Sequence, residues 1–84
     1  MRHASAASLD ELEPLLAKLR AVPGLVERSR GVFYRRSRAF LHFHEDPAGL
    51  FADLRLDADF ERFRVQDGGE QADLLRRVQA ALEP

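Results

Sequence analysis

The chain contains no cysteine and no tryptophan among its 84 residues. The lack of cysteine excludes disulfide bridges, thiolate metal ligands and cysteine nucleophiles. No apolar run approaches the roughly 20 residues that a membrane-spanning helix requires. Met1–Leu9 also lacks the apolar core of a signal peptide. We therefore expect a cytoplasmic protein that has no membrane partner.

Threonine, isoleucine and asparagine are absent too, and arginine outnumbers lysine by 12 to 1. This bias is typical of a GC-rich bacterial genome, so the positions of the arginines are more informative than their number. Hydrophobic residues make up 45% of the chain and charged residues 32%, with a net charge of -1. Such a balance is typical of a folded domain and excludes a disordered acidic or basic tail.

One small domain is expected, because the 84 residues include no repeat, linker or low-complexity segment. Residues 1–7 are predicted to form a flexible N-terminus, and residues 8–84 a single α+β domain. Leucines recur at helical spacing after Ser8, which has the character of a helix cap, and this pattern stops at Pro23. A second helical pattern covers Glu70–Leu82.

Between the two helices the apolar pattern changes to a period of two, which is typical of β-strands. Four strands and a weaker fifth are predicted: Leu25–Ser29, Val32–Arg36, Arg38–His44, Leu50–Leu56 and Arg62–Val65. Their connections are too short for parallel crossovers, so the sheet must be antiparallel. One face needs a cover that only the terminal helices can supply. The expected fold is therefore an α+β two-layer sandwich, with four to five strands and both helices on one face.

The turn at Arg36-Ser37 suggests which side chains share a face. A two-residue hairpin there would pair Tyr34 with Ala39, and Phe33 with Phe40. Because directly paired residues share a face, the expected core of the sheet consists of Val32, Tyr34, Ala39, Leu41, Phe43, Leu50, Ala52, Leu54 and Leu56. The other face is expected to be open, basic and aromatic, with Phe33, Arg35, Arg38, Phe40, His42, His44, Phe51, Asp53, Arg55, Arg62 and Arg64.

His42 and His44 are two residues apart on one predicted strand, so their side chains point to the same side. Either register of the hairpin closed by Glu45–Gly49 places Asp53 opposite or diagonal to His42. Two imidazoles and a carboxylate are suitable ligands for a divalent transition metal. A metal site at His42, His44 and Asp53 is one hypothesis. The alternative is a pair of surface imidazoles, with Asp53 bonded to one of them or to an arginine.

A metal-assisted enzyme that uses His42, His44 and Asp53 is a further hypothesis. A histidine beside a carboxylate can also act as a general acid or base. The sequence argues against an enzyme, because it lacks a cysteine and a glycine-rich phosphate loop, and Ser37 is a turn residue. No catalytic residue and no cofactor is assigned.

We expect a binding or interaction module that uses the open sheet face, with the binding residues Arg38, Phe40, His42, His44, Asp53 and Arg55. The arginines would donate charge-assisted hydrogen bonds to an anionic small ligand or a partner protein. A homodimer without a ligand is a second hypothesis, with Phe33, Phe40 and Phe51 packed across a two-fold axis. Nucleic-acid binding is a third, in which bases stack on the same aromatic rings.

The stretch Leu41-His-Phe-His-Glu-Asp46, followed by Ala52-Asp53, resembles a pattern of small bacterial domains labelled luciferase-like. Those domains carry a His-x-His-x-Asp run, an Ala-Asp pair on the next strand, a closing strand and a C-terminal helix. The resemblance covers about Gly31–Leu82, with these matching positions: His42, His44, Asp46 and Asp53. The closing strand of this chain, Phe60–Val65, lacks the tryptophan of the pattern. The label does not imply light emission, so the resemblance supplies no activity.

Overall fold

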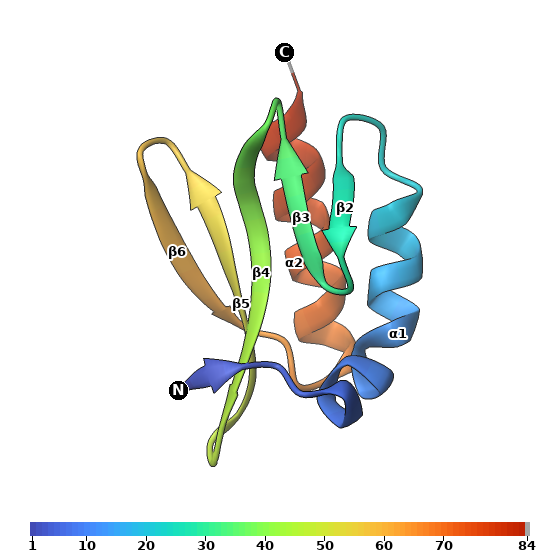
Figure 1. Ribbon diagram of the computed structural model, residues 1–84, viewed down its shortest axis with the longest axis vertical. Coiled ribbons are helices and arrows are strands. Elements are labelled where there is room, and N and C mark those ends of the chain that lie inside the picture. Colours follow the sequence, from blue (N-terminus) through green and yellow to red (C-terminus); the bar gives the residue numbers. More distant parts are fainter. Residues whose placement is uncertain (84) are drawn as a thin grey trace.

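The computed structural model describes residues 1–83, in which one face of a β-sheet is covered by two helices (Figure 1). The helices are α1 (Ala6–Arg20) and α2 (Gly68–Leu82). The strands are β1 (Arg2–His3), β2 (Val26–Ser29), β3 (Val32–Arg35), β4 (Arg38–Asp46), β5 (Gly49–Leu56) and β6 (Asp59–Arg64). Strands β2 to β6 follow one another in sequence order, all neighbours are antiparallel, and β1 pairs with β4. This arrangement confirms the expected α+β two-layer sandwich.

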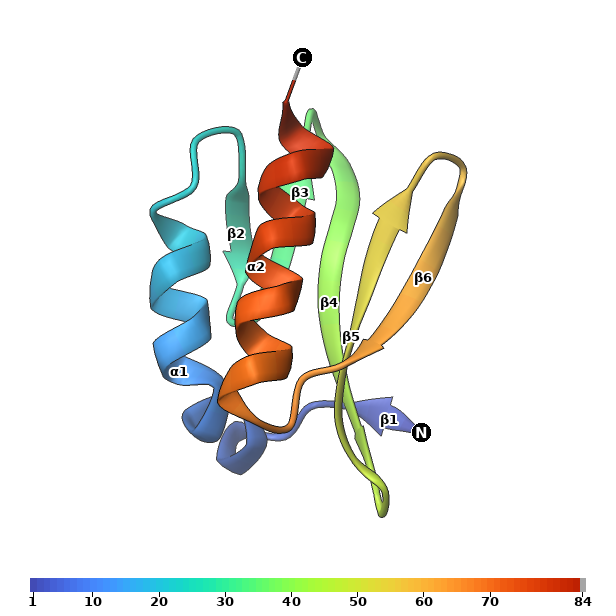
Figure 2. The same cartoon turned by 180° about the vertical axis from the view of Figure 1, so that it is seen from behind.

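The two helices lie side by side on the same face of the sheet (Figure 2). The core of the sheet includes five of the expected residues: Leu41, Phe43, Leu50, Ala52 and Leu54. The helices contribute Leu12, Leu15, Leu16, Leu19, Leu74 and Val78 to the same cluster. These leucines recur at spacings of three and four residues, so they form the single apolar stripe that a helix needs to pack on a sheet. Among the described residues, neither helix combines the length and the apolar character required to cross a membrane.

The N-terminal segment differs from the prediction. Residues 1–7, which we expected to be flexible, include β1 and the beginning of α1. Ser5 rather than Ser8 caps the helix, because its side chain accepts a hydrogen bond from the backbone N–H of Ser8. The hydroxyl of Ser8 instead donates to Glu45 of β4 (2.9 Å), and the backbone N–H of Ser5 donates to the same carboxylate (2.5 Å). Glu45 therefore holds the N-terminal segment against β4.

The predicted faces of β3 are wrong. Tyr34 does pair with Ala39, but Phe33 pairs with Leu41 instead of Phe40. Phe40 is thus an extra residue on β4, which makes this point a β-bulge. As a result Phe33 is fully buried on the helix side, and Phe40, next to Leu41, is only 4% exposed. Four residues expected in the core are only half-buried: Val32, Tyr34 and Ala39 near the bulge, and Leu56 at the end of β5.

The bulge can be tested through the stability of Phe33→Ala. Removal of a fully buried aromatic side chain should lower the free energy of unfolding by about 3–5 kcal/mol. The matched control is Val26→Ala on β2, where the side chain is 58% exposed, and the expected change is within about 0.5 kcal/mol. Urea unfolding followed by circular dichroism measures both values. Equal effects of the two substitutions would contradict the observed register.

Charged side chains attach α1 to the hairpin of β2 and β3. Arg20 of α1 donates from Nε to Oε1 of Glu27 on β2, at 2.6 Å. The other carboxylate oxygen of Glu27 accepts from the backbone N–H of Gly31 in the turn, at 2.9 Å. The bond from Arg20 is the main reason that the pKa of Glu27 lies below its ordinary value of 4.5. The ionised form of Glu27 is therefore favoured by folding.

We expect the contribution of Glu27 to disappear in acid. Because its pKa is lower in the folded protein, the stabilisation is complete above about pH 4.5 and is lost as the pH falls through the folded value. Glu27→Gln should therefore lower the melting temperature at neutral pH, and the difference from the wild type should shrink as the solution is acidified. Melting curves over a pH series measure this. A difference that stays constant into acid would show that the charge of Glu27 has no part in stability.

Candidate functional site

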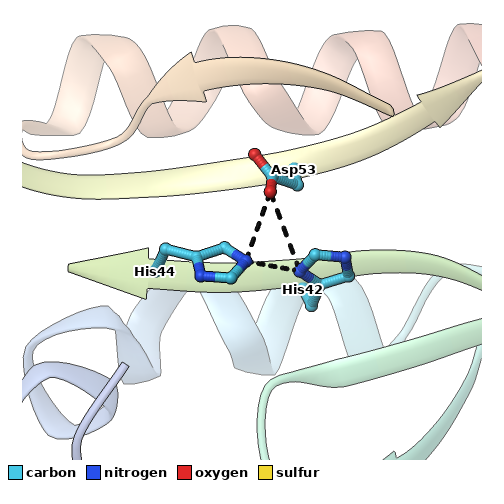
Figure 3. Close-up of side chains that lie close together, drawn as sticks. All are labelled: His42, His44 and Asp53. Atoms are coloured by element: carbon cyan, nitrogen blue, oxygen red, sulfur yellow. Dashed lines mark hydrogen bonds and ion pairs between the residues drawn. The ribbon is translucent and has the colours of Figure 1, made fainter. Parts of the chain in front are cut away.

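His42, His44 and Asp53 each bring one potential metal-ligating atom to the same place on the open face of the sheet (Figure 3). The pairing of β4 with β5 brings these side chains together, because His42 lies directly opposite Asp53. This register is one of the two that the sequence allowed. Nδ1 of His42 lies 2.8 Å from Nε2 of His44. Oδ2 of Asp53 lies 3.2 Å from Nε2 of His44 and 4.0 Å from Nδ1 of His42. We call these three residues the histidine cluster.

The carboxylate of the histidine cluster is held by Arg62 of β6, which pairs directly with Asp53. Arg62 donates from Nε to Oδ1 at 2.7 Å and from Nη2 to Oδ2 at 2.8 Å. This bidentate contact is the main reason that the pKa of Asp53 is below its ordinary value. It also raises the pKa of Arg62. Asp53 is therefore a fixed, ionised carboxylate although it is only 7% exposed.

The imidazole of His42 is held in its neutral form. Burial is the largest cause that lowers its pKa, and the neighbouring His44 adds to the effect, whereas Asp53 opposes it. A neutral imidazole has one ring nitrogen with a free lone pair. At 2.8 Å one ring nitrogen can donate its N–H to the other, and the tautomers decide which one donates. In tautomers in which both nitrogens present lone pairs, a cation between them would be needed.

His3 and Phe60 complete the surroundings of the histidine cluster. The ring of His3 stacks on His44 with centroids 4.8 Å apart, since His3 pairs with His44 across β1 and β4. The ring of Phe60, on β6, lies 4.8 Å from that of His42. The position of His3 beside His44 could not be expected from the sequence. β1 has only two residues, so no periodic pattern could indicate it.

The six residues expected to bind a ligand on the open face do not form one site. Phe40 is buried on the helix side, so its placement on the open face is wrong. Arg38 pairs with Arg35, whose guanidinium reaches the carbonyl of Ala81 in α2, and this places Arg38 on the helix side as well. Arg55 lies on the open face, where its guanidinium carbon is 4.4 Å from the centre of the Phe60 ring.

Two of the three rings that the homodimer and nucleic-acid hypotheses used, Phe33 and Phe40, are buried. Neither ring is available to pack across a two-fold axis or to stack on a base. Phe51, the third ring, is half-buried beside His44 on the neighbouring strand. Asp46, the remaining position of the luciferase-like pattern, accepts a hydrogen bond from the backbone N–H of Ala48 within the turn.

Comparison with known proteins gives no match for this chain among family models, curated proteins or solved structures.

The structure predicts unequal roles for two arginines of β6. Arg62→Met leaves the buried carboxylate of Asp53 without its main partner, so it should lower the urea midpoint clearly. Arg64→Met is the matched control, because Arg64 pairs with the more accessible Glu70, and exposed ion pairs contribute little. Urea unfolding of both variants at neutral pH provides the comparison. A smaller loss for Arg62→Met than for Arg64→Met would contradict the role given to Arg62.

Proposed function

We propose that the protein is a binding module that holds one divalent transition-metal ion, of the zinc type, on the open face of its sheet. The ligands are Nδ1 of His42, Nε2 of His44 and Oδ2 of Asp53. The observation that carries the proposal is the approach of these three atoms, from 2.8 to 4.0 Å apart. A bound cation would satisfy all three lone pairs at once.

The spacing of the donor atoms agrees with a tetrahedral ion. With bonds of about 2.1 Å, two ligand atoms of a tetrahedral zinc site are about 3.4 Å apart. The three edges of the triangle, 2.8, 3.2 and 4.0 Å, lie on either side of that value. Small rotations of the two imidazoles would equalise them, whereas the backbone pairing of His42 with Asp53 would not need to change.

Arg62 can keep part of its contact when the ion is bound. Only Oδ2 of Asp53 faces the imidazoles, while Oδ1 accepts from Nε of Arg62. The carboxylate would therefore bind the ion through one oxygen and remain oriented through the other. Such support from a neighbouring side chain is usual for metal-binding carboxylates.

Three ligands leave one position of a tetrahedral ion open, to be taken by water or a fourth side chain. His3 is the nearest further imidazole, stacked on His44 and exposed. Its strand is attached to β4 through the pairing of Arg2 with Glu45. His3 is therefore the side chain best placed to complete the coordination.

Titration calorimetry with zinc chloride tests the proposal. We expect one ion per chain, with affinity reduced at least about tenfold in His42→Ala, His44→Ala and Asp53→Asn, because each removes a ligand. Asp46→Asn is the matched control and should bind as the wild type does, since Asp46 is bonded within its turn. The absorption spectrum of the cobalt complex reports tetrahedral coordination. Weaker binding in His3→Ala would identify the fourth ligand.

The proposal fails if zinc does not bind to the folded wild-type protein, or if the three ligand variants bind as tightly as Asp46→Asn. Circular dichroism of each variant without metal shows whether it is folded. Zinc should also raise the melting temperature of the wild type, because an ion that binds only the folded state stabilises it.

A further inference from the structure

The sheet opens into a fork at one end. Strand β4 pairs with β5 only from Leu41, opposite Leu54, to the hairpin turn. Before Leu41, β4 pairs with β3 alone, and beyond Leu54, β5 pairs with β6 alone. Figure 1 shows the two strands diverging at the end where the C-terminus lies. The bulge at Phe40 explains the divergence, because an extra residue bends its strand and increases the local twist.

The fork contains a cavity of about 580 Å³ that is lined by four arginines. Three of them, Arg35, Arg36 and Arg38, come from the β3–β4 hairpin, and Arg55 comes from β5. Phe40, which is only 4% exposed, contributes a small part of the wall. We call this cavity the arginine fork.

Two of the four arginines, Arg55 and Arg35, donate hydrogen bonds to backbone carbonyls at the arginine fork. Arg55 spans the gap between the strands, since its Nε donates to the carbonyl of Ala39 at 2.8 Å. Arg35 donates from Nη1 to the carbonyl of Ala81 near the end of α2, at 3.0 Å. These bonds use only part of the donors of each guanidinium, which carries five N–H groups. Arg55 also donates from Nη1 to the carbonyl of Ala58 at 3.3 Å. A ligand could accept from the donors that these three bonds leave unused.

None of the four guanidinium groups forms an ion pair with a carboxylate of residues 1–83. The contrast with the rest of the molecule is clear, because six other arginines do form one: Arg2, Arg20, Arg30, Arg62, Arg64 and Arg76. Asp57 also lines the cavity without pairing to any of the four. The arginine fork therefore has a marked excess of positive charge, which attracts anions.

The turn at Arg36 and Ser37 has a backbone conformation that disfavours arginine. Arg36 has φ 52° and Ser37 has φ 67°, a left-handed pair that favours asparagine and glycine. An arginine in this conformation is less stable than asparagine would be. The backbone of the turn thus gives no reason for an arginine at this position, while the side chain adds a charge to the cavity.

We infer that the arginine fork binds a small molecule through a phosphoryl or pyrophosphoryl group. Guanidinium groups match the geometry of phosphate oxygens and bind them through paired hydrogen bonds. A volume of about 580 Å³ is in the range of small-molecule sites. The arginine fork is separate from the histidine cluster. Phe60 contacts one residue of each, Arg55 and His42.

Pyrophosphate is the probe for the arginine fork. Titration of metal-free protein at low salt, followed by calorimetry, should show saturable binding to one site. Arg38→Gln should weaken it about tenfold, as expected for the loss of one charge-assisted contact. Arg28→Gln is the matched control, because Arg28 lies over the ring of Tyr34 and is not among the residues that line the cavity, while the substitution changes the net charge equally. This variant should bind nearly as the wild type does.

Two further variants separate binding from folding. Arg36→Asn should weaken pyrophosphate binding while raising the urea midpoint, because asparagine suits the left-handed turn. Asp57→Asn should strengthen binding, since it removes the negative charge from the wall, and asparagine tolerates the φ of 55° at this position. Both variants should bind zinc as the wild type does, which keeps this test independent of the metal site.

The inference is overturned if pyrophosphate shows no saturable binding to the folded wild type. It is also overturned if Arg38→Gln weakens binding no more than Arg28→Gln, because the effect would then reflect net charge alone.

Discussion

One extra residue in β4 determines how the two faces of this sheet are divided. If Phe40 were an ordinary member of the strand, Phe33 would point to solvent. The bulge instead brings both rings to the helix side, where they fill the core beside Leu41. It also bends β4 away from β5, which opens the arginine fork. The core, the open face and the cavity all depend on this irregularity, and a bulge is a specific feature of a sheet rather than a defect.

The sequence allows the layers of the fold to be predicted, because helical and strand periods are local properties of the chain. It also allows the contact of His42 with Asp53 to be predicted, since the hairpin between β4 and β5 is regular and has a well-marked turn. The face of Phe33 could not be predicted in this way. Period-two alternation assumes an uninterrupted strand, and one inserted residue exchanges the faces of everything beyond it. Nothing local to the sequence marks Phe40 as that residue.

The role of the N-terminal segment was beyond sequence reasoning for a different reason. Two residues are too few to form a strand without a partner, and Glu45 attaches this segment to β4, since it pairs with Arg2 and accepts hydrogen bonds from Ser5 and Ser8. That contact joins residues about forty positions apart. Its consequence for the candidate site is direct, because β1 brings His3 onto His44. All three histidines of the chain therefore gather on one face, although only two of them are neighbours in sequence.

The two proposed sites need charges of opposite sign, and strand β5 supplies a charged residue to each. Asp53 supplies the negative group of the histidine cluster, and Arg55, two residues later on the same face, supplies a positive group to the arginine fork. Arg55 makes no ion pair with Asp53, because the carboxylate is occupied by Arg62, while Arg55 lies against Phe60 and the carbonyl of Ala39. The aromatic ring of Phe60 thus lies between the proposed cation site and the proposed anion site. Ligands of opposite charge in such neighbouring sites would attract each other, so occupation of one would favour rather than oppose occupation of the other.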